Sequence, residues 1–214
     1  MSTLSLARLM AWLSPVFPTG GFAYSVGLEQ AVADGRVHDQ QTLQEWLRTI
    51  LTSGSMWNDA VLLAAAYRTN GSKLPSLSAL ARALAPTAER HRETVDQGAA
   101  FLHAAEPWAI CDAPREAPLP VAIGAISARA KIPLLEALTA SLQTQISNQL
   151  QAAIRLSVTG QTGAAQLLAR LETTVLVVAE RAEQSTLDDL GGSAFIADIT
   201  SGQHETLEPR IFLS

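Results

Sequence analysis

The segment from Pro133 to about Val158 carries the strongest pattern in the sequence, because apolar residues recur in it every three or four positions. That spacing is typical of one face of an α-helix. No charged residue stands between Glu136 and Arg155, although an ordinary surface helix carries Lys and Glu on its outer face. The face opposite the apolar residues is formed by Gln143, Thr144, Ser147, Asn148 and Gln151. We therefore expect a long helix covered on both sides, either by this fold alone or by a second subunit.

The same helical period continues through most of the chain, and strand signals are weak. Proline and glycine interrupt it often enough to separate individual helices. Two expected helices begin near Pro75 and Pro86. The others cover about 4–13, 24–35, 39–51, 57–68, 121–131, 133–158 and 163–183. We predict an all-α fold, a single-domain helical bundle of roughly eight to ten helices.

The length of 214 residues suits a single all-helical domain, residues 1–214. Residues 106–120 contain four prolines and cannot form one continuous helix, so we expect a Pro-rich internal linker there. Residues 13–29 contain Pro15, Pro18, Gly20 and Gly21 close together. Prolines restrict the backbone and glycines permit positive φ angles, so this segment predicts a sharp elbow before a helix.

Several motifs that define enzymes are absent from the sequence. The glycines after Pro18 are not followed by the Lys-Ser/Thr of a phosphate-binding loop, and no hydrolase elbow surrounds Ser25. The four histidines are far apart, and no HExxH or CxxC motif is present. We expect a chain that neither hydrolyses nucleotides nor holds a metal ion. A helical enzyme with Glu29 and Asp59 in a pocket remains an alternative.

The composition excludes other classes of protein. A net charge of −5 without a basic cluster argues against nucleic-acid binding. No run of about 18 apolar residues predicts a membrane span. A single cysteine, Cys111, is expected to be a small buried or half-buried residue, and it fits the reducing cytosol. Charged residues are only 16% of the chain, which fits either a surface covered by other proteins or a general preference for alanine.

Three segments are too particular to be explained by local structure alone. The first is Ser14-Pro15, followed by Pro18-Thr19-Gly20-Gly21-Phe22-Ala23-Tyr24-Ser25-Val26-Gly27-Leu28-Glu29. The second is Arg155 to Gln161, and the third is the ending His204-Glu205 to Ser214. All three resemble the urease accessory protein F family, in which the second forms a turn between two core helices. Asp59 and the Arg92-Glu93 stretch are weaker matches. Leu213 and Val158 depart from the family pattern, which often has Arg and Pro there.

The resemblance implies a cytoplasmic, non-enzymatic helical scaffold that forms a homodimer and binds urease accessory protein D (also called H). That pair is expected to recruit the accessory GTPase G and to dock on apo-urease. No cofactor is expected on this chain, since nickel and GTP are handled by the complex, in which this chain regulates GTP-dependent nickel insertion. An all-α regulator unrelated to urease is the alternative that the residues leave open.

The resemblance also selects candidate partner-binding residues. Glu29 is the first choice, because a carboxylate on a helix after the elbow could orient the GTPase or hold a transient cation. Arg155 and Asp189 are second choices, although Asp189 precedes two glycines and suits a turn. Phe22 and Tyr24 are expected to be either interface anchors or core residues. Residues 204–214 are expected to form a docking tail that orders on partner binding, with His204, Glu205, Arg210 and Phe212 as its candidate contacts.

Overall fold

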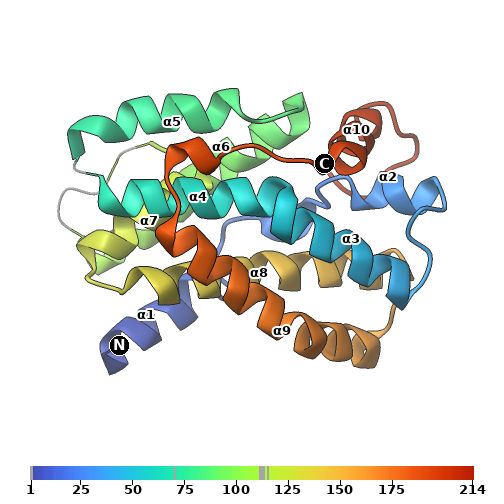
Figure 1. Cartoon of the computed structure of the whole chain (residues 1–214), viewed down its shortest axis with the longest axis horizontal. Coiled ribbons are helices and arrows are strands. Elements are labelled where there is room, and N and C mark those ends of the chain that lie inside the picture. The colour runs from blue at the N-terminus through green and yellow to red at the C-terminus, as the bar shows by residue number, and fades with distance from the viewer. Residues whose placement is uncertain (1, 70, 111–113, 115) are drawn as a thin grey trace.

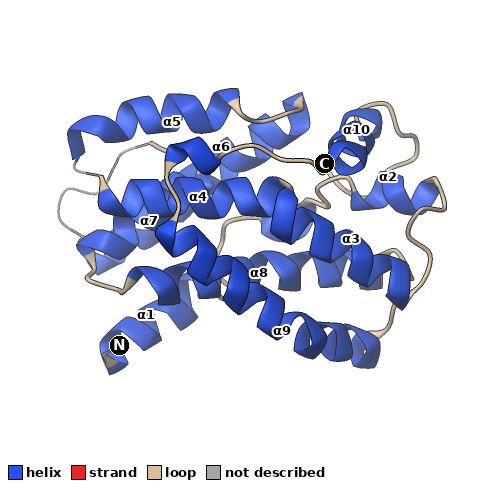
Figure 2. Ribbon diagram, viewed as in Figure 1, coloured by secondary structure: helices blue, strands red, loops and turns tan. Residues whose placement is uncertain are grey.

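The computed structural model describes residues 2–69, 71–110, 114 and 116–214, and every regular element in these ranges is a helix (Figure 2). The predicted all-α class is confirmed. The α-helices are α1 (Thr3–Trp12), α2 (Leu28–Ala33), α3 (Gln40–Ser53), α4 (Ser55–Arg68), α5 (Leu74–Ala83), α6 (Ala88–Ala105), α7 (Leu119–Arg129), α8 (Leu134–Arg155), α9 (Gln161–Gln184) and α10 (Phe195–His204). Short 3-10 turns are η1 (Gly21–Ala23), η2 (Gly71–Lys73), η3 (Glu106–Trp108) and η4 (Leu187–Asp189).

Helix α4 forms the centre of the bundle, and it contacts α3, α5, α7, α8 and α9 (Figure 1). Its apolar residues are buried on nearly every side, as expected of a helix surrounded by others. Helix α7 packs most closely on it: a Cβ atom added to Gly124 would lie 2.3 Å from the carbonyl oxygen of Leu63. Only glycine permits that approach.

The helix boundaries follow the expected signals at several points. Asp39 caps α3, and its carboxylate accepts a hydrogen bond from the amide of Thr42, with a capping box completed by the Thr42 side chain. Pro75 lies in the first turn of α5, and Pro86 directly precedes Thr87, the residue that caps α6. The predicted linker contains η3 and ends where α7 begins at Leu119. Within it, residues 111–113 and 115, including Cys111, lie outside the described residues.

Two helices differ from the sequence-based expectation. Helix α2 begins only at Leu28, because Val26 and Gly27 both have positive φ angles, of 53° and 78°. Helix α10 is an additional helix, because the last helix expected from the sequence ends near residue 183. In the structure α10 lies beside α2 at one end of the bundle, next to the C-terminus (Figure 1).

The uncharged face of α8 is covered by the N-terminal part of the same chain. The hydroxyl of Thr144 donates to the carbonyl oxygen of Leu13 at 3.0 Å. A Cβ atom at Gly21 would lie 2.9 Å from the side-chain nitrogen Nδ2 of Asn148, so this part of the elbow packs directly on the helix. Thr144 and Asn148 are half-buried, whereas Gln151 is exposed. Coverage by the fold is therefore seen, and a subunit interface stays a prediction.

In the parts of the chain that the structure describes, none of the helices combines the length and the apolar character needed to cross a membrane.

Candidate functional site

The elbow predicted from residues 13–29 is anchored by aromatic rings. The ring of Phe17 lies 5.6 Å from that of Phe101 and 6.0 Å from that of Trp108, measured between centroids. Gly20 then adopts a left-handed conformation with φ 76°, which turns the chain into η1. These contacts place Phe22, Ala23 and the residues after them beside the C-terminal end of the chain.

The last residues pair with the elbow through their backbones. The amide of Leu213 donates to the carbonyl oxygen of Ala23 at 2.8 Å, and the amide of Ser25 donates to the Ser214 oxygen at 2.7 Å. The hydroxyl of Ser25 donates to the same oxygen. Side chains of an extended segment point alternately to opposite sides. Phe212 and Ser214 accordingly point inward and are buried, whereas Ile211 and Leu213 point outward.

Glu29 holds this tail from the first turn of α2. Its carboxylate accepts hydrogen bonds from the amides of Ile211, at 2.7 Å, and Phe212, at 3.0 Å. The same carboxylate lies 3.0 Å from Nε2 of His204 at the end of α10. The Glu29 side chain is only 6% exposed, so these partners replace the water that it would otherwise bind. Glu29 therefore bonds to groups of its own chain, and contact with a partner stays a prediction.

His204 lies between two carboxylates and is completely buried. Its Nδ1 is 2.7 Å from Glu89, on α6, and its Nε2 faces Glu29. A neutral imidazole has one N–H donor, so both contacts are donated by the ring only when it carries both protons. Arg210 donates a second charged hydrogen bond to Glu89, at 2.6 Å. In that protonation state two carboxylates face one imidazolium and one guanidinium, and the charges balance.

A second buried cluster adjoins the first. Arg90 donates to Asp59 at 2.5 Å and lies 3.2 Å from Glu93, and the hydroxyl of Ser214 lies 3.2 Å from the other oxygen of Glu93. Burial raises the pKa of Glu93 and of Asp59, while the guanidinium of Arg90 acts in the opposite direction. Burial also raises the pKa of Tyr24, with the charges of nearby carboxylates adding to the effect. The tail therefore ends on a buried ion pair.

The structure brings together eight of the nine candidate residues. Arg155 donates to the carbonyl oxygen of Phe22 at 2.7 Å, and its guanidinium carbon lies 4.1 Å above the ring centre of Phe212. Glu205 accepts from the amides of Ala88 and Glu89 at the start of α6. The residues that meet around the tail are Phe22, Tyr24, Glu29, Arg155, His204, Glu205, Arg210 and Phe212.

The two aromatic candidates have different environments. The side chain of Phe22 is exposed, as an interface anchor would be, whereas Tyr24 is buried in the core. Asp189 lies elsewhere and forms a capping box with Thr186, while its carbonyl oxygen accepts from the indole of Trp57. This is the turn chemistry that its neighbouring glycines suggested. Whether any of these residues contacts a partner stays a prediction.

The tail differs from the expected separable docking segment. His204 ends a helix, and Phe212 and Ser214 are 2% and 1% exposed. These residues are therefore part of the core of the chain by itself. Glu29 and Glu89 bond to His204, Glu29 accepts from the amide of Phe212, and Ser25 and Glu93 bond to Ser214. A docking role for the outward-facing side chains is a separate matter and stays a prediction.

Sequence reasoning missed Glu89 and the role of Ser25. A glutamate in the first turn of a helix is ordinarily explained by the helix dipole, so Glu89 carried no functional signal. Ser25 belongs to the elbow motif and lacks the context of a hydrolase nucleophile, and neither observation predicts a contact with the tail. Its pairing with Ser214 spans 189 positions in the sequence, and no local pattern reveals such a contact.

The polar groups of this site bond to one another, and their contacts hold the tail in place. Within the described residues, no group of three or more His, Cys, Asp or Glu side chains could hold a metal ion. The network keeps three apolar side chains in solvent: Phe22 on the elbow, with Ile211 and Leu213 on the tail, are 75%, 59% and 51% exposed. We call these three residues the elbow–tail surface. Fold and site thus define an all-α protein with an internally bonded tail.

Comparison with known proteins identifies the family. The UreF family model matches residues 37–172. Over 218 aligned residues the chain is 51% identical to the urease accessory protein UreF of Mesorhizobium japonicum, covering 100% of this chain and 98% of the relative. It is 50% identical to the urease accessory protein UreF of Brucella ovis, over 99% of this chain and 95% of the relative. The chain belongs to the UreF family of urease accessory proteins, as its motifs indicated.

Proposed function

We propose that this chain is a non-catalytic scaffold in urease maturation, acting in the cytoplasm together with the other urease accessory proteins. Membership of the UreF family and the names of its relatives support the connection with urease. The scaffold role is proposed mainly from two hydrogen bonds. The Glu29 carboxylate accepts from the amides of Ile211 and Phe212 and so holds the tail against the elbow.

The elbow–tail surface is the proposed contact for urease accessory protein D/H. Exposed aromatic and aliphatic side chains on a rigid support are typical anchors of protein interfaces. Phe22 is held through its carbonyl oxygen by Arg155, and Leu213 is held through its amide by Ala23. A partner would meet these apolar groups already in position, so little conformational entropy is lost on binding.

The later steps of maturation follow from the family resemblance. The complex of this chain with protein D/H recruits the accessory GTPase G and docks on apo-urease, and a homodimer of this chain forms its centre. GTP belongs to the GTPase, and nickel is the cargo. In this proposal Glu29 regulates the GTPase indirectly, by holding the tail, since its carboxylate is bonded within its own chain.

Capture by protein D/H tests this function. Leu213→Asp puts a charge on the elbow–tail surface but leaves the backbone bond to Ala23 in place. Leu187→Asp is the matched control, because Leu187 is similarly exposed but lies on η4. We expect tagged protein D/H to capture wild type and Leu187→Asp equally, and to lose Leu213→Asp. Equal capture of all three proteins would exclude this surface as the contact.

A reconstituted activation assay with apo-urease, GTPase G, GTP and nickel extends the test. Leu213→Asp should activate little urease, and Leu187→Asp should activate as much as wild type. A chain that is captured by none of the urease accessory proteins would instead support the alternative, an all-α regulator unrelated to urease.

A further inference from the structure

The tail bonds to the elbow and to α2 mainly through its backbone. Glu29 accepts from the amides of Ile211 and Phe212, and the carbonyl oxygen of Ala23 accepts from the amide of Leu213. Neighbouring residues of the tail carry the same amide group, so a tail displaced by one residue can form bonds of the same kind. These backbone bonds therefore hold the tail without selecting its register.

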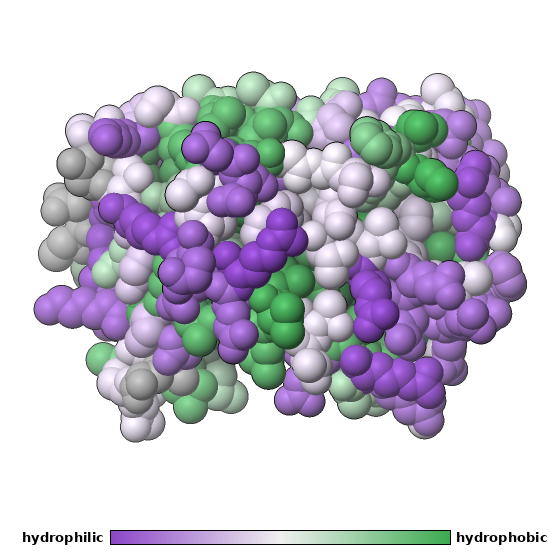
Figure 3. Space-filling model, in the orientation of Figure 1, coloured by the Kyte–Doolittle hydropathy of each residue, from purple (hydrophilic) through white to green (hydrophobic). Residues whose placement is uncertain are grey.

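A displacement by one residue would change the elbow–tail surface. In the observed register Phe212 and Ser214 are buried, whereas Ile211 and Leu213 are exposed. A shift of one residue, about 3.3 Å along an extended chain, turns each side chain to the opposite side, so Phe212 would face solvent in place of Leu213. Exposed apolar side chains of α10 lie at the same end of the molecule (Figure 3), and this end presents a constant apolar surface only if the register is fixed.

Two side-chain contacts of the tail tolerate such a displacement. Arg210 has a long, flexible side chain that is 40% exposed, and its guanidinium can reach Glu89 from neighbouring positions of the tail. Phe212 belongs to the hydrophobic core, and a displaced tail would put Ile211 or Leu213, which are also apolar, in its place. Neither contact excludes the neighbouring registers.

The contact between Ser214 and Glu93 does exclude them. The hydroxyl of Ser214 lies 3.2 Å from Oε2 of Glu93, and both residues are buried. A displaced tail moves this hydroxyl away, and in one direction it replaces the hydroxyl with the apolar side chain of Leu213. The oxygen of a buried carboxylate would then lose its donor, which is unfavourable. This contact therefore distinguishes the observed register from its neighbours.

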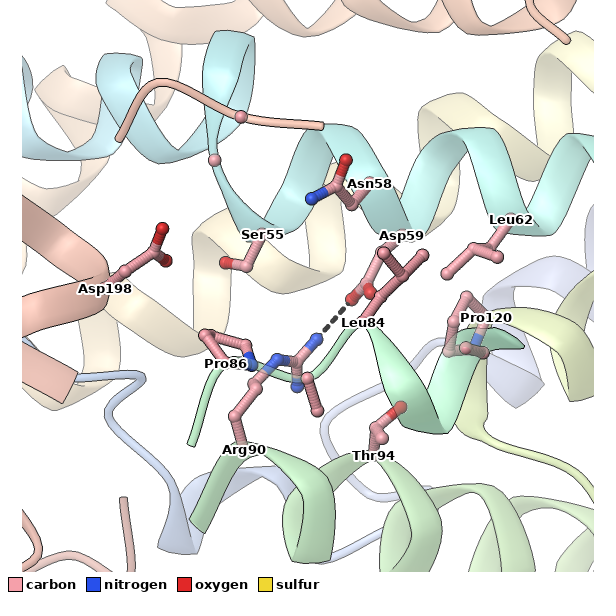
Figure 4. Close-up of a pocket in the computed structure, with 14 residues that line it drawn as sticks. Ser55, Asn58, Asp59, Leu62, Leu84, Pro86, Arg90, Thr94, Pro120 and Asp198 are labelled. Atoms are coloured by element: carbon pink, nitrogen blue, oxygen red, sulfur yellow. Dashed lines mark hydrogen bonds and ion pairs between the residues drawn. The ribbon is translucent and has the colours of Figure 1, made fainter. Parts of the chain in front are cut away.

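Glu93 is held in a fixed orientation by its own helix, α6. Its Oε1 lies 3.2 Å from the guanidinium of Arg90 and accepts from the side chain of Gln97 at 3.1 Å, which leaves Oε2 for the tail. Arg90 is itself paired with Asp59 of α4, and Figure 4 shows this ion pair at the wall of a pocket. The position of the Glu93 carboxylate is thus set by the packing of α6 on α4.

We propose that Glu93 is a positioning residue that fixes the register of the tail by bonding the hydroxyl of Ser214. Through this bond Glu93 determines that Leu213, and not Phe212, belongs to the elbow–tail surface. The consequence for binding rests on the proposed function, because that surface is the proposed contact for protein D/H. The register itself belongs to the free chain and is measured there.

Methyl NMR of the free chain with a soluble gadolinium chelate tests the register. In wild type the chelate should broaden the methyl signals of Ile211 and Leu213, because both side chains are exposed. Ser214→Ala removes the hydroxyl and little else. We expect this variant to give a second, protected set of signals for both residues, since the displaced register should become at least about tenfold more populated. A released tail would leave all of these signals exposed.

Variants of Glu93 test the same bond from the other side. Glu93→Gln keeps a side-chain oxygen of the same reach, and it should retain the wild-type signals. Glu93→Ala removes the acceptor and should give the protected set. If Glu93→Ala does not fold, the result with Ser214→Ala decides.

Ser185→Ala is the matched control, since it removes a buried hydroxyl bond at the end of α9 and should give the wild-type signals. Only exposed signals in Ser214→Ala, or a protected set already in wild type, would overturn the proposal. Loss of the fold in Ser214→Ala would overturn it as well, because the hydroxyl would then be a general stabilising group. Tagged protein D/H should capture Ser214→Ala less than wild type. Equal capture despite a displaced register would contradict the proposed contact surface and leave the role of Glu93 in place.

Discussion

The carboxylate of Glu29 lies 3.0 Å from Nε2 of His204, across 175 positions of sequence and with almost no access to solvent. Through this contact the helix that follows the elbow and the helix that precedes the tail become one unit. The two helices also approach closely, because a Cβ atom on Gly27, at the start of α2, would lie 3.0 Å from the backbone of Ser201 in α10. Both sequence motifs thus serve one buried site.

Removing the Glu29 carboxylate should destabilise the fold. Glu29→Ala leaves the amides of Ile211 and Phe212, and a ring nitrogen of His204, without their acceptor. Breaking a buried, hydrogen-bonded charge in this way costs about 3–5 kcal/mol. Chemical unfolding should show a loss of that order. The neighbouring Gln30→Ala removes only an exposed contact with Asp34 and should change the stability by less than about 0.5 kcal/mol. Equal stability of both variants would contradict the network.

Shortening the side chains of two adjacent tail residues should destabilise the fold by very different amounts. Phe212 is buried beneath Arg155, whereas Leu213 is half exposed. Phe212→Ala should lower the free energy of unfolding by about 3–5 kcal/mol, and Leu213→Ala by less than about 1 kcal/mol. Thermal melting of the two variants measures this difference. If the Phe212→Ala protein is as stable as wild type, the tail does not contribute to the core and is a separable segment.

The raised pKa of Glu93 determines the direction in which its contribution to stability should change with pH. Burial raises its folded-state pKa above the unfolded value, so the folded state binds the proton more tightly. Its contribution to stability is therefore greatest below the unfolded pKa and declines as the pH rises through the folded pKa. Wild type should accordingly gain stability relative to Glu93→Gln as the pH falls from neutral towards 4.

Asp39 provides a control of opposite sign. Hydrogen bonds from the amide and hydroxyl of Thr42 lower the pKa of its carboxyl group. The stability that Asp39 contributes is present above its unfolded pKa and is lost as the pH falls through the folded value. Wild type should therefore lose stability relative to Asp39→Asn over the acidic range. The same trend in both comparisons would show that these two groups do not govern the dependence.

Arg155→Lys should separate binding from stability. The planar guanidinium stacks on Phe212 while donating to the Phe22 carbonyl oxygen, and an ammonium group cannot reproduce both contacts. Because Arg155 is exposed, we expect a stability loss of at most about 1 kcal/mol. Capture by protein D/H should nevertheless weaken, because Phe22 loses its support. Arg36→Lys, on an exposed pair with Asp34, is the control that should leave capture unchanged.

Local patterns predicted most of the fold. Apolar periodicity, the capping residue Asp39 and the prolines near helix starts, Pro75 and Pro86, predicted the positions of most helices, because a helix is determined largely by its own sequence. Helix α10 was missed for a physical reason. Its apolar residues Phe195 and Ile199 face solvent, so the helix lacks the usual division into a buried face and a polar face.

The members of the site were predictable, but their arrangement was not. The family resemblance selected Glu29 and His204, yet nothing in either motif shows that one side chain bonds the other. Contacts over such separations depend on how the helices pack. Glu89 could not be distinguished from an ordinary first-turn glutamate, and Tyr24 could not be distinguished from an exposed aromatic residue, because burial is a property of the assembled bundle.

Amide hydrogen exchange at Ile211 and Phe212 tests most directly whether Glu29 holds the tail in the free chain. In wild type both amides donate to the Glu29 carboxylate and should exchange far more slowly than in an unstructured peptide. Glu29→Gln keeps only one acceptor oxygen for the two amides. Exchange at Ile211 and Phe212 should therefore accelerate, while amides in the middle of α8 stay protected. Exchange of Ile211 and Phe212 at the unstructured rate in wild type would contradict a tail built into the fold.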